Sequence, residues 1–211
     1  MSKPVPTKAE IALFEPFSGL TLEHIHVPKT REAFISASAE IRAANIVGFD
    51  TESKPTFAVG EASEGPHVLQ FALPDKAYLF QIHQTEGHPF LMELLQSKQL
   101  IKVGFDLKSD GRHIHARLGV NLDGIVDLNT VFSMAGYHKN IGVRTAVGLV
   151  INQRFAKPRH VTTSNWSQHQ LTPRQLLYAA NDAYAALKVM EALALPREEL
   201  PIYKFESPLV G

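Results

Sequence analysis

The sequence predicts an α/β fold in which helices flank a mixed sheet, and three observations support this. Short apolar runs at 46–50, 68–73, 77–82 and 100–105 have the length of buried strands. Two of them flank "PDK", which is typical of an antiparallel hairpin. Segments with helical spacing stand between and after these runs, so helices can cover the sheet faces.

The elements of the first third follow from local signals. Residues 1–22 show no period, and we expect an N-terminal extension that lies on or off the body. "HIHVP" at 24–28 alternates and ends in proline, which predicts an edge strand. "TREAFISASAEIRAAN" at 30–45 predicts a helix with Thr30 as its N-cap. The run at 46–50 then forms a strand before a long loop.

The later elements are mainly helices. The strongest is predicted for 172–195, where Thr172 is placed to cap it and Pro173 takes its first position. A polar connector at 152–170 precedes it. We expect one domain over 23–195, followed by a C-terminal tail at 196–211. Further helical or mixed segments are predicted at 89–98, 108–119, 124–137 and 142–151.

Composition excludes several classes of protein. Of the 211 residues, 45% are apolar and 20% charged, which fits a folded domain rather than a disordered chain. No apolar run approaches the roughly 20 residues that span a bilayer, and the first 25 residues lack a signal-peptide pattern. Cysteine is absent, so we expect an intracellular protein, cytoplasmic or nuclear. Its 21 basic and 21 acidic residues argue against a protein that coats nucleic acid.

Two carboxylates close the strand "VGFDTES". Asp50 and Glu52 are two residues apart, so in a strand they project from one face while Thr51 points away. Acids this close repel each other unless a cation or a proton lies between them. A strand end that frays into solvent is the simpler explanation for an isolated Asp-x-Glu.

A second group of polar residues lies in the last long helix, within "LYAANDAYAAL". Tyr178 and Asp182 are four residues apart and share a helix face. The surrounding sequence is apolar, so an unpaired Asp182 would be costly there. Tyr184 lies on a different face and is interpreted as a packing residue.

A third group lies in "VGFDLKSDGRHI", where two aspartates are four residues apart. Asp106 is placed to cap the following helix. Asp110 falls in its first turn, where the helix dipole favours a negative charge. Either residue can therefore be explained by helix stability alone.

Taken together and in this order, the three motifs resemble the DEDD superfamily of 3′–5′ exonucleases in its DEDDy branch. The text "SNWSQHQLTPRQLLYAANDAYAALKVMEAL" at 164–193 is similar to Werner-type exonuclease domains and more distantly to ribonuclease D. The likeness spans about 24–194 and implies a ribonuclease H-like fold. The middle motif departs from the pattern, because Asp106 stands where Asn is common and Ser109 where an aromatic residue is common.

The resemblance implies a metal-dependent exonuclease that releases nucleoside 5′-monophosphates from a 3′ end. Oxygen ligands without thiols suit Mg²⁺ or Mn²⁺, and two such ions can stabilise the attacking and leaving oxygens. Tyr178 would orient the attacking water, and no other cofactor is expected. The implied ligands are Asp50, Glu52 and Asp182 for the first ion, with Asp50 bridging to a second ion supported by Asp110.

Contacts with the substrate are expected beside the acid motifs. The candidates are Thr51, Lys54, Phe105, Lys108 and Arg112. The similarity of residues 164–193 to Werner-type exonuclease domains favours DNA over RNA as the substrate. A helicase or repair partner would act in trans. Three alternatives stay open: a catalytically weak or inactive nucleic-acid-binding module of the same fold, an RNA-processing exonuclease of ribonuclease D type, and a phosphohydrolase that acts on small nucleotides.

Overall fold

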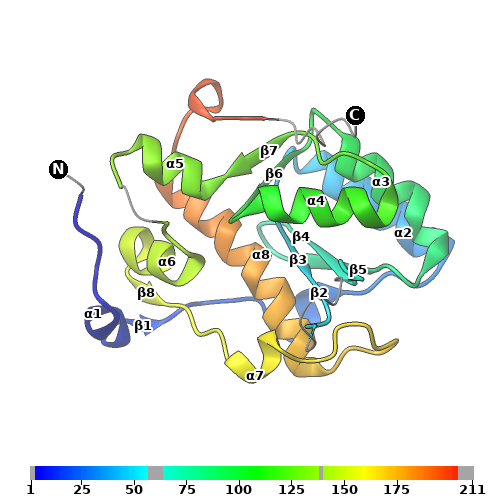
Figure 1. The fold of residues 1–211 in the computed structure, drawn as a ribbon, viewed down its shortest axis with the longest axis horizontal. Coiled ribbons are helices and arrows are strands. Elements are labelled where there is room, and N and C mark those ends of the chain that lie inside the picture. Colours follow the sequence, from blue (N-terminus) through cyan, green and yellow to red (C-terminus); the bar gives the residue numbers. More distant parts are fainter. Residues whose placement is uncertain (1–2, 57–63, 138–139, 204–211) are drawn as a thin grey trace.

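A computed structural model describes residues 3–56, 64–137 and 140–203 of the chain. They form a six-stranded mixed sheet and a separate two-stranded sheet, with helices on both faces of the larger one (Figure 1). In spatial order the large sheet contains β2 (Ile25–His26), β5 (Ala77–Gln81), β4 (Val68–Ala72), β3 (Ile46–Glu52), β6 (Ile101–Gly104) and β7 (Ile125–Asp127). The small sheet pairs β1 (Glu15–Pro16) with β8 (Gln153–Arg154) in parallel.

The expected α/β class and its antiparallel hairpin are confirmed. β3, β4 and β5 are antiparallel neighbours, while β6 and β7 run parallel to β3. The expected edge strand is β2, which pairs with β5 at one edge of the sheet. β3 continues two residues beyond the predicted strand, so both Asp50 and Glu52 are held by the sheet.

Two layers of helix bury the sheet. One face packs against α2 (Arg31–Ala43), α3 (His88–Gln96) and α4 (Leu107–Leu118) around Phe49 and Phe71. The other face is crossed by α8 (Pro173–Leu193), with α5 (Leu128–Met134) and α6 (Val143–Ile151) beside it. In Figure 1, α8 runs diagonally across the middle of the molecule. No helix among the described residues is both long and apolar enough to cross a bilayer.

Local sequence explains where the predicted helices begin. The Thr30 hydroxyl accepts a hydrogen bond from the Ala33 amide at the start of α2. Thr172 and Gln175 form a reciprocal capping box at α8, with Pro173 in its first turn as expected. The mixed segment 124–137 resolves into β7 followed by α5, because Asp127 ends the strand and caps the helix through the Asn129 amide at 2.9 Å.

The N-terminal segment lies on the body and contains structure that its sequence did not reveal. It forms the short helix α1 (Lys8–Ala12) and strand β1, which pairs with β8. Asn181 of α8 then fixes the following residues, since its side chain bonds the amide of Leu20 at 2.6 Å and the carbonyl of Leu20 at 3.0 Å. The polar connector likewise contains β8 and the short helix α7 (Arg159–Thr162). Part of the predicted loop, 57–63, lies outside the described residues.

One close approach sets the distance between β3 and α8. A Cβ atom built on Gly48 would lie 1.9 Å from the carbonyl oxygen of Ala183. Only the absence of a side chain lets the helix backbone come this near to the strand. Asp182 is adjacent to Ala183, so this contact also sets how close Asp182 comes to the acids of β3.

A buried lysine gives a stability prediction that is independent of the acid motifs. Lys102 is fully buried in β6, and its ammonium donates to the carbonyls of Leu94 at 3.1 Å and Ser97 at 2.7 Å, at the end of α3. Burial lowers its pKa to about 7, and the nearby Asp123 opposes the shift. Above that pH folded Lys102 is neutral, while in the unfolded chain it keeps its proton up to about pH 10.

We therefore expect the free energy of unfolding to rise with pH above 7 through this residue, by up to about 1 kcal/mol per pH unit. Lys102→Met should lack this rise. Urea unfolding of both proteins at pH 7, 8 and 9 measures the difference. Parallel pH profiles for the two proteins would contradict the prediction.

Candidate active site

Three carboxylates from two elements converge where β3 meets α8. Asp50 and Glu52 project from one face of β3, and Asp182 projects from α8 toward them. One oxygen of each lies within 4.8 Å of the others. Asp182 and Glu52 are only 4% and 9% exposed, so the group is largely shielded from water. The interpretation of Asp50 and Glu52 as a fraying strand end is therefore wrong.

Burial raises the pKa of all three acids, and neighbouring carboxylates add to the shift for Asp50 and Glu52. Burial, and then the negative charge of Asp182, raises the pKa of Glu52 to about 8. The pKa of Asp50 is raised well above its usual value by burial and by the three neighbouring carboxylates, Asp182 first. Burial also raises the pKa of Asp182, and a neighbouring lysine opposes this. A cluster of this kind gains stability from any cation that enters it.

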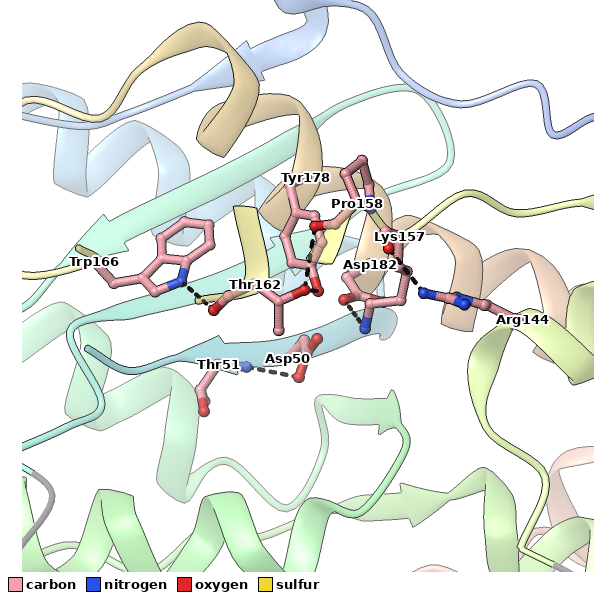
Figure 2. Close-up of polar contacts among 9 residues, drawn as sticks. All are labelled: Asp50, Thr51, Arg144, Lys157, Pro158, Thr162, Trp166, Tyr178 and Asp182. Carbon is pink, nitrogen blue, oxygen red and sulfur yellow. Dashed lines mark hydrogen bonds and ion pairs between the residues drawn. The ribbon is translucent and has the colours of Figure 1, made fainter. Parts of the chain in front are cut away.

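That lysine is Lys157, which the sequence did not single out. Its ammonium forms an ion pair with Asp182 and lies 5.4 Å from the centre of the Tyr178 ring (Figure 2). Burial would lower the pKa of Lys157, but Asp182 and Asp50 together raise it above its ordinary value. Arg144 of α6 donates to the Lys157 carbonyl at 2.8 Å, and this bond holds the segment around Lys157 in place. Lys157 lies 21 residues before Tyr178 in a segment without periodicity, so no local pattern marks it.

Tyr178 stands one helical turn before Asp182, as its spacing predicts. Its ring is buried, and its hydroxyl lies 2.8 Å from the hydroxyl of Thr162 in α7 (Figure 2). Burial and then the charge of Asp182 raise its pKa, so the phenol keeps its proton at neutral pH. Trp166 packs beside it, with ring centres 5.9 Å apart. Tyr184 is a packing residue as predicted, buried against Phe17.

Asp110 is held apart from the three converging acids. Its carboxylate accepts a hydrogen bond at 2.5 Å from the hydroxyl of Thr51, the β3 residue that points away from Asp50 and Glu52. Burial raises the pKa of Asp110 to about 7, although the bond from Thr51 opposes the shift. Asp106 occupies the N-cap position of α4 with a left-handed backbone and makes no side-chain cap bond. The Leu107 amide instead donates to Asp127 at 3.0 Å, so Asp127 orients the helix that carries Asp110.

The predicted substrate contacts lie in three different places. Phe105 lines a cleft of about 410 Å³ together with Asp50, Asp182, Lys157 and Arg144. Thr51 does not line this cleft but contacts Asp110. The three basic candidates are exposed: Lys54, Lys108 and Arg112.

Comparisons with known proteins identify the family of this chain. A family model described as 3′–5′ exonuclease matches residues 25–196. The mouse bifunctional 3′–5′ exonuclease/ATP-dependent helicase WRN is 30% identical over 165 residues, covering 76% of this chain and 12% of the relative. A 3′–5′ exonuclease of Arabidopsis thaliana is 28% identical over 150 residues, 70% of this chain and 52% of its own length. The chain thus spans about half or less of these relatives.

Solved structures share the fold. The Aedes aegypti Nibbler EXO domain superposes with a TM-score of 0.70 at 21% identity, covering 82% of this chain and 88% of that one. Trypanosoma brucei RNase D in complex with RNA U12 gives a TM-score of 0.72 at 20% identity, covering 84% and 64%. These likenesses confirm the ribonuclease H-like fold expected from the motifs.

Proposed function

The chain belongs to the 3′–5′ exonuclease domain family, and on that premise we propose that it hydrolyses phosphodiester bonds from the 3′ end of nucleic acid. The observation that carries the proposal is the convergence of Asp50, Glu52 and Asp182, two of which, Asp50 and Asp182, line a cleft. Tyr178 lies one helical turn before Asp182 on α8. The products would be nucleoside 5′-monophosphates. By the same proposal the domain extends over 23–195.

The residues present fit divalent cations. The converging ligands are carboxylate oxygens, which Mg²⁺ and Mn²⁺ prefer, and the contact of Lys157 with Asp182 shows that a positive charge is accommodated there. Asp50, Glu52 and Asp182 would hold one ion. Asp110, whose charge acts on Asp50, would support a second ion together with Asp50. When bound, such ions activate water and neutralise charge on the phosphate oxygens.

The protein's own groups would position the reactants. The Tyr178 hydroxyl keeps its proton at neutral pH, so it would orient the attacking water rather than deprotonate it. Thr162 holds this hydroxyl in place at 2.8 Å. Phe105 would contact the terminal nucleotide from the wall of the cleft, and the exposed Lys54, Lys108 and Arg112 would contact backbone phosphates.

The test is a digestion of 5′-labelled oligonucleotides with Mg²⁺ or Mn²⁺ and with EDTA. We expect stepwise shortening from the 3′ end that requires the metal.

DNA is the substrate that we favour, supported by the greater identity to the helicase-linked relative than to the RNase D structures. Matched DNA and RNA with 3′-recessed and single-stranded ends would decide this, and uncut oligonucleotides in every arm would overturn the proposal. A helicase partner in trans belongs to the same proposal, and its test is whether an added helicase extends digestion into blunt duplex.

A buried glutamine beside the acids yields a prediction about metal binding. Gln70 of β4 is fully buried directly opposite Asp50, so the two side chains share a sheet face. Both polar atoms of its amide lack a hydrogen-bond partner among the described residues. A polar group in that state lowers stability by about 1–3 kcal/mol. We interpret the amide as a group that hydrogen-bonds water in the metal-loaded acid cluster.

Gln70→Leu is therefore expected to raise the free energy of unfolding of the metal-free protein and to weaken Mn²⁺ binding. Urea unfolding and calorimetric titration measure the two effects. Gln81→Leu is the matched control, because Gln81 is also buried but donates to the Gln168 carbonyl at 3.0 Å, so its loss should destabilise. If Gln70→Leu destabilises the protein and leaves Mn²⁺ affinity intact, the interpretation fails.

A further inference from the structure

A second cavity lies beside the acid cleft, on the other side of the segment that carries Lys157. Its volume is about 580 Å³, larger than the acid cleft. Lys157 lines the acid cleft, whereas its neighbours Ala156 and Pro158 line the second cavity, so the segment forms a wall between them. Tyr178 also belongs to the wall of the second cavity, one turn of α8 before Asp182, which lines the acid cleft.

The cavity has an apolar floor. Phe17, from the N-terminal segment, packs edge to face on Phe155 with ring centres 5.4 Å apart. Leu177 is half-buried and Val161 nearly buried in the same floor. The bond between Asn181 and Leu20 holds the N-terminal segment in place as one side of the cavity. An apolar surface that includes an aromatic ring suits the flat face of a nucleobase.

The rim is basic. Arg154 of β8 and Arg174 of α8 are exposed and make no ion pair with any described residue. The imidazole of His160 lies beside them, and none of the described residues that line the cavity is acidic. This contrasts with the net charge of zero for the whole chain. Unpaired arginines above an apolar floor are complementary to phosphates joined to bases, a combination found in single-stranded nucleic acid.

We propose that this cavity, the Phe17–Arg154–Arg174 groove, binds nucleotides of a single strand outside the acid cleft. Phosphates contact the two arginines and a base lies on the floor beside Phe17. The inference rests on the proposed exonuclease function, since it concerns the strand whose 3′ end lies at the acids. It adds a strand-binding site that the three acid motifs do not contain. The groove would raise affinity for long strands without taking part in the cleavage step.

The test measures binding without turnover. A 5′-fluorescent single-stranded decanucleotide is titrated in EDTA, and anisotropy is followed from 50 to 200 mM salt. Arg154→Ala with Arg174→Ala is expected to weaken binding at least tenfold and to lower the slope of log affinity against log salt by about 1.4, because each phosphate contact on a single strand contributes about 0.7. Lys29→Ala with Lys98→Ala removes the same charge from exposed positions elsewhere and should leave the affinity within about twofold.

A kinetic arm separates this site from the reaction itself. With Mn²⁺, the groove variant should raise KM for a decanucleotide several-fold and leave cleavage of a dinucleotide unchanged. If both double variants weaken binding equally, or if neither does, the groove proposal is overturned while the exonuclease proposal stands. If no protein cleaves any substrate but the groove variant alone loses binding, the groove proposal stands and the exonuclease proposal fails. Thermal melting of each variant confirms that it is folded.

Discussion

Asp50→Asn is expected to abolish nucleic-acid hydrolysis while making the metal-free protein more stable. Asp50 lies in the cluster, where burial and then the charges of Asp182, Asp110 and Glu52 raise its pKa. Asparagine keeps the shape of the side chain and removes one of the repelling charges. Loss of an outer partner of a metal ligand costs about 10–100-fold, so loss of a ligand itself should cost more than 100-fold. Initial rates with saturating Mn²⁺ and urea unfolding in EDTA measure the two effects.

Asp182→Asn provides an internal contrast. It should abolish hydrolysis equally, but it should destabilise the metal-free protein because Lys157 loses its partner in a largely buried site. Asp75→Asn, on an exposed turn, is the neutral control for both measurements. The proposal that Asp50 is a ligand does not survive if Asp50→Asn retains more than a tenth of the rate. Equal stability changes for Asp50→Asn and Asp182→Asn would contradict the charge argument.

Lys157→Met is expected to destabilise the metal-free protein far more than the metal-loaded one. The ammonium is the cation that balances Asp182 in the structure, and its side chain is 25% exposed while that of Asp182 is 4% exposed. Breaking a buried pair costs about 3–5 kcal/mol, and the partial exposure of Lys157 reduces this to about 1–3 kcal/mol. A divalent cation would replace the missing charge, so saturating Mn²⁺ should restore most of the loss.

The matched control is Lys188→Met. Lys188 lies on α8 and its side chain is 27% exposed. It pairs with the carboxylate of Glu191 and lies 5.1 Å from the centre of the Tyr184 ring, so it makes the same kinds of contact as Lys157 outside the Asp50–Glu52–Asp182 cluster. Its loss should cost at most about 1 kcal/mol and should not depend on metal. Unfolding curves of both variants with EDTA and with Mn²⁺ make the comparison. A Lys157→Met defect of the same size in both conditions would refute the counter-ion role.

Elements with strong local signals were predictable, and contacts between distant segments were not. The period-2 placement of Asp50 and Glu52 and the Thr172 cap of α8 are local, and the structure has both as expected. Lys157 and Gln70 are important only because folding brings them to the acids. Their neighbours in sequence carry no motif that would reveal this.

Asp110 shows a different limit. Its place in the first turn of α4 could be predicted, but its hydrogen bond with Thr51 could not. A residue that points away from Asp50 in the strand turned out to hold the fourth acid. The N-terminal segment is similar, because β1 depends on β8, a partner 138 positions later in the chain. Pairing of this kind leaves no periodicity in either strand.

The missing side chain at Gly48 bears on which ion the cluster can accept. Even a methyl group there would press on the carbonyl of Ala183 and move α8, with Asp182, outward from β3. Small ions such as Mg²⁺ demand short, nearly octahedral oxygen contacts, whereas larger ions such as Ca²⁺ tolerate longer and less regular ones. A residue with no functional group would thus tune selectivity by ionic radius, through the spacing of two backbones.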